Sequence, residues 1–404
     1  MTIIGCNVKY YICVTPFFPS PSNWRGAYVL DQVKAILRNS DYQVMVFKPG
    51  TEDYEISGIR VYGFKAHQTR SFLFEGVFDS INARHFLKRV KELDINVNAI
   101  KFVHCHTGHY SVYGLALKEL NKKIKVLTQY HDLDPFTVRN GLFSTNPINS
   151  NYRARSAMKL LRQVDMHVCI SEPCRDNLLA FPNPRNEEQD AKYLSVLRTI
   201  KGLNPLLPQS VYVLNNGVDL TIFNPKEGMK HSEIFRIGCI ANFVELKGHM
   251  TLLKAFQLLV NKGYKDMRLS LLGTGPTRLA CEDFAKQTGI ASYIEWPQEV
   301  SHECLPDYYY SLDLYAMPSS YEGFGCVYTE AAACGIPFVG CYNNGAAECI
   351  TPEERDKWLI APGDYVKLAD IIERQYLCRD IQRLCKSYDI DYLVSHFMIN
   401  LSKA

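Results

Sequence analysis

The sequence lacks any unbroken apolar run of about 18 residues, so it predicts no membrane-spanning helix. It also lacks internal repeats and low-complexity segments. Residues 8–15 are apolar, but they have neither a charged lead nor a small-residue cleavage site, so we interpret them as a first β-strand and not as a signal peptide. Apolar residues make up 47% of the 404 residues, and this length favours two domains of about 200 residues each. The expected location is the cytoplasm.

Spacings typical of metal ligands are also missing. None of the fourteen cysteines stands in a Cys-x-x-Cys pair, and their mostly apolar surroundings are typical of small core residues in a reducing cytosol. His104, His106 and His109 follow a strand-like run, but no carboxylates or further cysteines that could complete a metal site are placed nearby. We therefore predict no bound metal and no other cofactor.

The most informative stretch is Glu322–Gly335, with the sequence EGFGCVYTEAAACG. A short apolar run, Leu312–Met317, precedes it and another, Phe338–Cys341, follows it, and both are typical of buried strands. The alanine-rich segment Thr329–Cys334 favours a helix. The stretch therefore predicts a strand, a glycine loop, a helix and a parallel strand, an arrangement that places ligands beyond the carboxyl ends of the strands.

The residue types in this stretch suit a nucleoside diphosphate sugar. Gly323 and Gly325 let the backbone approach a ligand, and the N–H groups at the start of the following helix favour a phosphate. Glu322 and Glu330 flank this position, and a carboxylate accepts hydrogen bonds from hydroxyl groups. The pattern thus predicts phosphate binding between two groups that bind sugar hydroxyls.

The string from Pro318-Ser319 through Glu322-Gly323-Phe324-Gly325 to Gly335-Ile336-Pro337 resembles the signature of the retaining glycosyltransferases of family 4, in which seven residues separate two glutamates. That family has the GT-B fold, with two Rossmann-like α/β domains facing each other across a cleft. The resemblance implies an acceptor-binding domain at 1–225, a nucleotide-sugar-binding domain at 226–385, and a tail at 386–404 that crosses back to the first domain. It implies a hexosyltransferase that needs no metal.

The same resemblance assigns roles to individual residues. Glu330 would hold the ribose, Glu322 the sugar, and Lys247 the diphosphate, while His131 would lie against the transferred sugar. Catalytic roles fall on His131, Lys247 and Glu322, and the acceptor side is lined by His106, Thr107 and Gly108. Donor-binding roles fall on Gly26, Asn242, Lys247, Gly273, Gly275, Glu322, Gly323, Phe324, Gly325 and Glu330.

Three features stand against a direct transfer of these roles or offer another interpretation. Asn242 occupies a position where the family has an arginine that also binds the diphosphate. The turn Gly273–Gly275 lacks the third glycine, at Arg278, that a dinucleotide-binding loop would need, so the resemblance instead makes this turn a wall of the nucleotide pocket. Asp132 and Asp134 form the Asp-x-Asp motif of a different transferase fold, and we interpret them as turn residues. The segment 182–203 looks like an insertion, and we assign it no function.

Charge is distributed unevenly along the chain. Residues 1–225 carry a net charge of +8, and the remainder carries −5. The expected helix 82–93 places Phe86 and Leu87 on one face and basic residues mostly on the other, which favours binding to an anionic membrane surface, with a solvated face as the alternative. The basic residues are Arg84, Lys88, Arg89 and Lys91.

The expected donor is a UDP-sugar, and the expected acceptor is a glycan or a lipid-linked glycan of cell-surface polysaccharide or glycolipid assembly. Nucleic acid is not an expected partner. Two alternatives remain open. The chain could be a degenerate transferase that binds a nucleotide-sugar or a partner without turnover, which Asn242 would explain, or a sugar phosphorylase or epimerase with the same fold.

Overall fold

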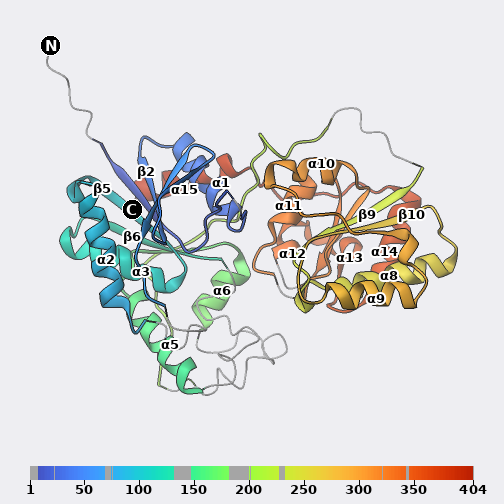
Figure 1. Ribbon diagram of the computed structural model, residues 1–404, viewed down its shortest axis with the longest axis horizontal. Coiled ribbons are helices and arrows are strands. Elements are labelled where there is room, and N and C mark those ends of the chain that lie inside the picture. The colour runs from blue at the N-terminus through green and yellow to red at the C-terminus, as the bar shows by residue number, and fades with distance from the viewer. Residues whose placement is uncertain are drawn as a thin grey trace, which may run out of the picture. The chain divides into compact units, whose positions relative to one another are not determined.

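The computed structural model describes residues 8–21, 23–68, 74, 76–131, 147–181, 200, 202–226, 233–320, 322–342 and 345–403. The chain forms two compact units, shown in Figure 1: unit 1 is Met1–Asn215 with Asp391–Ala404, and unit 2 is Asn216–Ile390. The division thus falls before the expected boundary at 225/226. The reason is that the segment after Asn215 bonds to unit 2, where the Val218 N–H donates to the Tyr388 carbonyl (2.8 Å) and Tyr310 Oη donates to the Asn224 carbonyl (2.8 Å).

Unit 1 is built on a sheet with the strand order β3-β4-β2-β1-β5-β6-β7-β8, in which all neighbours are parallel except β3 and β4. The strands are β1 (Tyr10–Val14), β2 (Gln43–Pro49), β3 (Tyr54–Ile56), β4 (Ile59–Phe64), β5 (Ile100–His106), β6 (Lys125–Tyr130), β7 (Met166–Cys169) and β8 (Val211–Val213). The helices are α1 (Ala27–Arg38), α2 (Asp79–Glu92), α3 (Ser111–Leu120), α5 (Pro147–Leu161) and α6 (Glu172–Ala180).

A helix cap and a buried aromatic ring help to position two of these helices. Ser171 caps α6, because its Oγ accepts a hydrogen bond from the Cys174 N–H (3.1 Å). Phe86 of α2 is buried with its ring 5.2 Å from that of Phe47 and 5.3 Å from that of Phe64. Phe86 therefore belongs to the core and cannot take part in a membrane-binding face.

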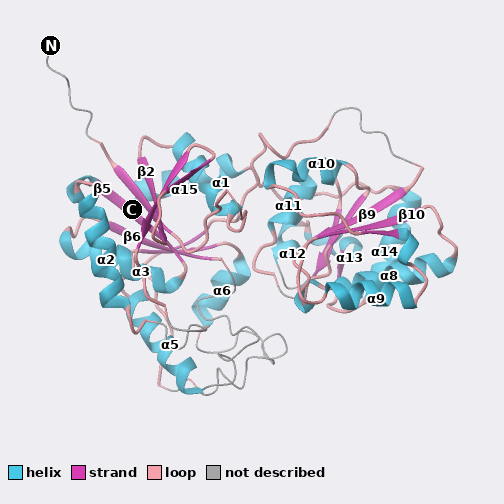
Figure 2. Cartoon of the chain, in the orientation of Figure 1, coloured by secondary structure: helices cyan, strands magenta, loops and turns pink. Residues whose placement is uncertain are grey.

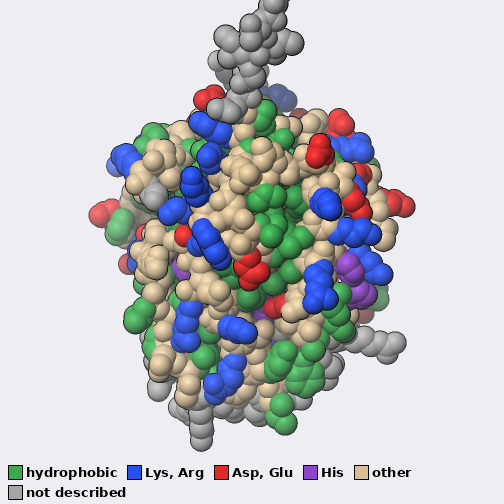
Figure 3. Space-filling view, turned by 90° about the vertical axis from the view of Figure 1, so that its left-hand side faces the viewer, with side chains coloured by type: hydrophobic (Ala, Val, Ile, Leu, Met, Phe, Trp, Pro, Cys, Tyr) green, Lys and Arg blue, Asp and Glu red, His purple; other side chains and the backbone are tan. Residues whose placement is uncertain are grey.

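The basic side chains of unit 1 gather at one edge of its sheet. Lys9, Lys101 and Lys125 are exposed at the amino-terminal ends of β1, β5 and β6, which are neighbours in the sheet. Figure 3 looks onto this side of the molecule and shows Lys and Arg side chains spread across it. On α2, Lys88 and Lys91 are exposed, whereas Arg89 pairs with Asp53 (2.6 Å).

Unit 2 is a second α/β layer structure, with the parallel strand order β11-β10-β9-β12-β13-β14 and helices beside the sheet (Figure 2). Helix α14 (Tyr365–Cys378) ends where Arg379 adopts a left-handed conformation with φ 52°. The strands are β9 (Phe235–Ile240), β10 (Met267–Leu272), β11 (Ile294–Glu295), β12 (Leu314–Ala316), β13 (Phe338–Cys341) and β14 (Leu359–Ile360). The helices are α8 (His249–Lys262), α9 (Arg278–Gln287), α10 (Leu305–Tyr310), α11 (Cys326–Ala333), α12 (Gly345–Cys349), α13 (Arg355–Trp358) and α14 (Tyr365–Cys378).

The C-terminal helix α15 (Ile390–Lys403) packs on unit 1. Its Phe397 ring lies 5.9 Å from the ring of His104 and 5.2 Å from that of Tyr212. Asp391 accepts hydrogen bonds from Arg38 (2.9 Å) and from Asn39 Nδ2 (2.7 Å) of unit 1. In the described part of the chain, none of the helices is both long and apolar enough to span a bilayer.

Replacing Phe397 tests this packing directly. Phe397→Ala should lower the free energy of unfolding of unit 1 by about 3–5 kcal/mol, because it removes a fully buried aromatic ring and leaves a cavity. Ile399→Ala on the same helix is the matched control, since the Ile399 side chain is 52% exposed and should change little. Urea unfolding followed by far-UV circular dichroism measures both, and equal effects would contradict the packing.

Candidate active site

In unit 2, the loops that follow the neighbouring strands β9 and β12 meet at the carboxyl ends of those strands. The Ser320 N–H donates to the Leu246 carbonyl (2.8 Å), and Ser319 Oγ donates to the same carbonyl (3.0 Å). Gly248 packs so closely that an added Cβ would lie 2.2 Å from the Pro318 carbonyl oxygen, so this position requires glycine. The two loops are therefore held as one surface.

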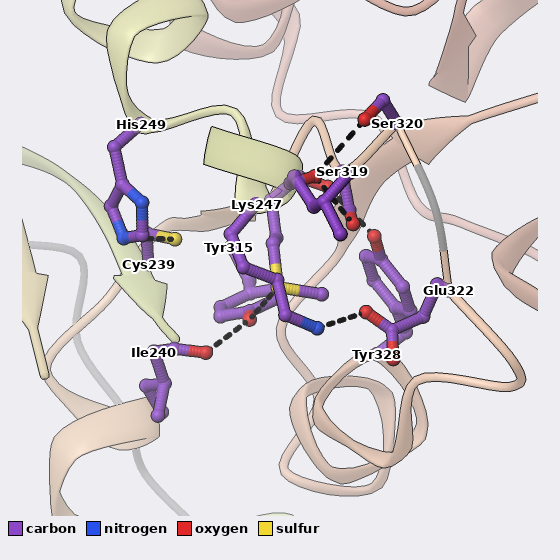
Figure 4. A network of polar contacts seen from close by, with 11 residues as sticks. Cys239, Ile240, Lys247, His249, Tyr315, Ser319, Ser320, Glu322 and Tyr328 are labelled. Atoms are coloured by element: carbon purple, nitrogen blue, oxygen red, sulfur yellow. Dashed lines mark hydrogen bonds and ion pairs between the residues drawn. The ribbon is translucent and has the colours of Figure 1, made fainter. Parts of the chain in front are cut away.

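This contact brings Lys247 and Glu322 together. Lys247 ends the 3₁₀-helix Glu245–Lys247, and its Nζ donates a hydrogen bond to Glu322 Oε2 (Figure 4). The side chains of Lys247 and Glu322 are 24% and 16% exposed, so both remain accessible to a ligand. An ammonium group has three N–H donors, and Lys247 can therefore bind an anion while it keeps Glu322 as a partner.

Gly325, with φ 83°, precedes helix α11, whose first turn offers N–H groups without partners inside the helix. Glu322 Cγ would lie 2.9 Å from a Cβ at Gly325, which places the Lys247–Glu322 pair beside this helix end. Phe324 was expected to bind the donor, but its side chain is buried, with its ring 5.6 Å from that of Tyr388. Donor contact by Gly323 and Phe324 would come from backbone atoms.

Glu330 lies one helical turn further along α11 and is 8% exposed. Its Oε2 accepts a hydrogen bond from Tyr309 Oη (2.8 Å), and its Oε1 lies 3.8 Å from His302 Nε2. Burial raises the pKa of Tyr309 well above its usual value, so the phenol stays a hydrogen-bond donor. Sequence reasoning missed Tyr309 and His302, because no local pattern links them to Glu330.

A third loop of unit 2 lies beside these two. The Phe243 N–H donates to the Thr274 carbonyl (2.7 Å), which places the Gly273–Gly275 turn against the loop that carries the exposed Asn242. Arg278 donates to the Gly273 carbonyl (2.9 Å), and its guanidinium lies 5.8 Å from the ring of Phe243. Arg278 also pairs with Glu282 (2.9 Å), so part of its charge is compensated. The chain thus places a different cation near the loop that lacks the family's arginine.

Unit 1 contributes a pair of histidines at the carboxyl ends of β5 and β6. His106 Nδ1 lies 2.7 Å from His131 Nε2, and the Tyr28 ring of α1 lies 5.0 Å from that of His131. The ring centroids of His104 and His106 are 4.6 Å apart, so these two residues lie on the same side of β5. His106 is 1% exposed, so its ring lies behind the surface it was expected to line.

Thr107, which follows His106 in the chain, has an unusual backbone conformation. Thr107 has φ 83° and ψ 150°, a region that is essentially restricted to glycine, and it is held there by its N–H bond to the Gln129 carbonyl (2.8 Å). Gly108 follows it, and its carbonyl accepts a hydrogen bond from Ser111 Oγ (2.6 Å).

Gly26 has φ 93°, and an added Cβ would lie 2.7 Å from the Phe17 carbonyl. The need for glycine at this position is explained by packing alone.

Burial keeps His104, His106 and His131 of unit 1 neutral. It lowers the pKa of His104 and of His131 to about 3, and it lowers the pKa of His106 well below its usual value, with the neighbouring histidines adding to the effect. Within the described residues, no group of three or more His, Cys, Asp or Glu side chains is placed to hold a metal ion. Asp132, Asp134 and most of the segment 182–203 lie outside the described residues.

Solved structures share this architecture. Sucrose-phosphate synthase from Thermosynechococcus elongatus superposes with a TM-score of 0.67 at 18% identity, covering 97% of this chain and 95% of that one. Anabaena HepE in complex with UDP-glucose superposes with a TM-score of 0.65 at 16% identity, covering 98% and 100% of the two chains. These likenesses define the fold as GT-B.

Family models assign the sequence more closely. The model "Glycosyl transferases group 1" matches residues 223–389, and the model "Glycosyltransferase Family 4" matches residues 26–187. Protein CapJ of Staphylococcus aureus is 30% identical over 190 residues, which span 46% of this chain and 44% of CapJ. A GDP-mannose-dependent alpha-(1-6)-phosphatidylinositol monomannoside mannosyltransferase of Mycolicibacterium smegmatis is 31% identical over 28% of this chain and 31% of the relative. The chain belongs to the family 4 glycosyltransferases.

The buried histidines generate a prediction about acid stability. The pKa of His104 and His131 falls to about 3, and that of His167 and His249 to about 4, against 6.5 for an ordinary histidine. Below about pH 6.5 the unfolded chain therefore binds protons that the folded chain does not. Each residue should lower the free energy of unfolding by up to about 1.4 kcal/mol per pH unit between about pH 6.5 and the folded pKa.

Denaturant unfolding at a series of pH values measures this loss, which should be absent above about pH 7. His167→Gln should flatten the slope, whereas His396→Gln, at an exposed position of α15, is the matched control. A slope that neither variant changes would contradict the assignment.

Proposed function

We propose that this protein is a retaining glycosyltransferase that moves a sugar from a nucleoside diphosphate sugar to an acceptor hydroxyl and requires no metal. The observation that carries the proposal is the position of Lys247 and Glu322 beside the start of α11, with Glu330 one turn along the same helix. A cation and helix N–H groups suit a diphosphate, and carboxylates suit hydroxyl groups.

In the proposed reaction, the bond between the anomeric carbon and the diphosphate oxygen breaks, and a bond from that carbon to the acceptor oxygen forms. The proton of the acceptor hydroxyl passes to water, and the nucleoside diphosphate leaves with the electron pair of the broken bond. Lys247 and the first-turn N–H groups of α11 stabilise the charge that develops on the leaving diphosphate. Glu330 binds the ribose through the oxygen that Tyr309 does not occupy, and Glu322 binds the sugar. The family resemblance assigns His131 a place against the sugar.

The proposed donor is a UDP-sugar, and the proposed acceptor is a glycan or lipid-linked glycan of cell-surface assembly. The mannosyltransferase relative is named as GDP-mannose-dependent, which makes GDP-mannose the matched competitor. HepE, solved with UDP-glucose, supports the choice of a UDP-sugar.

The direct test is turnover of UDP-glucose and GDP-mannose, followed as release of the nucleoside diphosphate with and without EDTA. Slow donor hydrolysis that EDTA leaves unchanged supports the proposal. Activity that EDTA abolishes and manganese restores would overturn metal independence. Turnover that requires free phosphate would indicate a phosphorylase, and binding without any turnover would indicate a degenerate transferase.

Lys247 should carry most of the charge stabilisation, because Asn242 supplies none. Lys247→Ala should lower turnover by about 10²-fold or more, as expected when one group that stabilises the transition state is lost. Lys254→Ala, at another lysine of unit 2, is the matched control. Asn242→Arg adds the family's second cation, and a rise in turnover would show that this cation was only missing. A Lys247→Ala enzyme with ordinary turnover would exclude Lys247 from this role.

The contribution of Glu330 to nucleotide binding can be measured separately from that of Tyr309, which donates a hydrogen bond to it. Glu330→Gln should weaken binding of the nucleoside diphosphate by about 10-fold, because one acceptor oxygen becomes an N–H donor toward the ribose. Tyr309→Phe removes the hydrogen bonds from Tyr309 Oη to Glu330 (2.8 Å) and to the Val327 carbonyl (3.2 Å) but leaves the carboxylate, so it should weaken binding less. Titration calorimetry with UDP and GDP measures both variants. Equal affinity of Glu330→Gln and the wild type would exclude ribose binding by Glu330.

A membrane surface is proposed as a further partner of unit 1. The cations that would contact it are the exposed lysines at the amino-terminal edge of its sheet and the exposed Arg84, Lys88 and Lys91 of α2, of which Lys88 also pairs with Glu92 (3.8 Å). Each cation contributes about 1 kcal/mol near anionic lipid. Docking there would leave His106 and His131, at the opposite edge of the sheet, uncovered.

Sedimentation with phosphatidylserine vesicles tests this partner. Binding should weaken with salt and drop when Arg84, Lys88 and Lys91 are changed to Gln, whereas Lys254→Gln and Lys357→Gln in unit 2 serve as the control. Protein that stays in the supernatant at low salt would end the proposal.

A further inference from the structure

The geometry between His106 and His131 is that of a directed hydrogen bond. Their ring planes differ by only 5°, their centroids are 4.9 Å apart, and His106 Nδ1 lies 2.7 Å from His131 Nε2. Parallel rings stacked face to face would keep their atoms about 3.5 Å or more apart. The rings therefore meet edge to edge and nearly in one plane, where the nitrogen lone pair and the N–H bond both lie.

The surroundings fix His106 more firmly than His131. His106 is 1% exposed, and its ring packs 4.6 Å from that of His104, which in turn bonds to Tyr11 Oη through Nδ1 (2.6 Å). These residues come from the neighbouring strands β1 and β5. His131, by contrast, follows the last residue of β6 and is only partly buried. His106 is thus the anchored member of the pair.

The bond also links the tautomers of the two rings. One nitrogen must carry the hydrogen and the other must not, because two N–H groups or two lone pairs would repel each other. Since both rings are neutral, the choice at His106 determines which nitrogen of His131 is protonated. The remaining nitrogen, His131 Nδ1, is buried and has no hydrogen-bond partner in the part of the chain that the structure describes.

We propose that His106 is a positioning residue that orients the His131 ring and sets its tautomer, and with it the hydrogen-bonding character of His131 Nδ1. The role of His131 toward the sugar rests on the proposed function, whereas the control of its ring and tautomer does not. His106 itself touches no substrate, because its ring is buried and its Nδ1 is occupied. This replaces the expected acceptor-side role of His106.

Two variants of His106 separate this role from simple packing. The amide of His106→Asn falls where Nδ1 of the histidine lies and can donate or accept, so it should restore the bond to His131. The amide of His106→Gln extends to the place of Nε2 and should not. Both variants put a neutral amide into the same buried position, which makes them a matched pair.

The first measurement determines the tautomer of His131 and does not depend on enzyme activity. Nitrogen-15 chemical shifts of the histidine rings in the full-length chain should show one tautomer for His131 in the wild type. They should show a mixture in His106→Gln. An unchanged His131 tautomer in a folded His106→Gln protein would overturn the proposal, whatever the enzyme does.

The second readout is transfer from UDP-glucose or GDP-mannose. His106→Gln should lower kcat by about 10-fold to 100-fold, the scale of a misplaced group, with unchanged affinity for UDP or GDP, which unit 2 binds. His106→Asn should recover most of kcat. If His131→Ala abolishes transfer and both His106 variants retain it, the positioning role is wrong and the proposed function stands. If the wild type transfers nothing, the proposed function fails, and the tautomer measurement still decides the role of His106.

Discussion

The ion pair between Lys247 and Glu322 is the interaction on which the site in unit 2 depends. Seventy-five positions separate these residues along the chain, and they meet because β9 and β12 are neighbouring parallel strands whose following loops share the Leu246 carbonyl. A partly buried ammonium would be costly without a partner, and Glu322 supplies that partner before any ligand arrives. The same contact places the cation beside the start of α11, so the charge and the helix N–H groups act at one place.

Unit 1 uses the same arrangement of parallel strands for a different kind of group. His106 and His131 are uncharged, and burial holds their pKa values low enough that they stay so. Neutral imidazoles can orient hydroxyl groups through hydrogen bonds. The strained backbone of Thr107, directly after His106, is the kind of local cost that proteins carry at functional sites.

The sequence was sufficient to predict the elements around Glu322–Gly335, because each depends on a local pattern. Phe338–Cys341 is β13 with the expected bounds. The expected helix Thr329–Cys334 overlaps α11, which begins at Cys326 and ends at Ala333. The partners of the site residues could not be predicted, since they depend on strand order. Tyr309 reaches Glu330 across 21 positions, and His106 reaches His131 across 25. The expected role of His106 rested on its place at the end of a strand, and sequence gives no information on whether such a ring faces a ligand or a neighbour.

Titration calorimetry of UDP, UMP and uridine, with GDP, GMP and guanosine as the matched series, tests the central claim most directly. The claim is that Lys247 and the start of α11 bind a diphosphate while Glu330 binds the ribose. We expect one nucleoside diphosphate to bind at one site per chain in EDTA. The monophosphate should bind at least about 10-fold more weakly, because it lacks the second charged phosphate group. Equal affinity for the diphosphate and the nucleoside, or no binding in either series, would contradict the account.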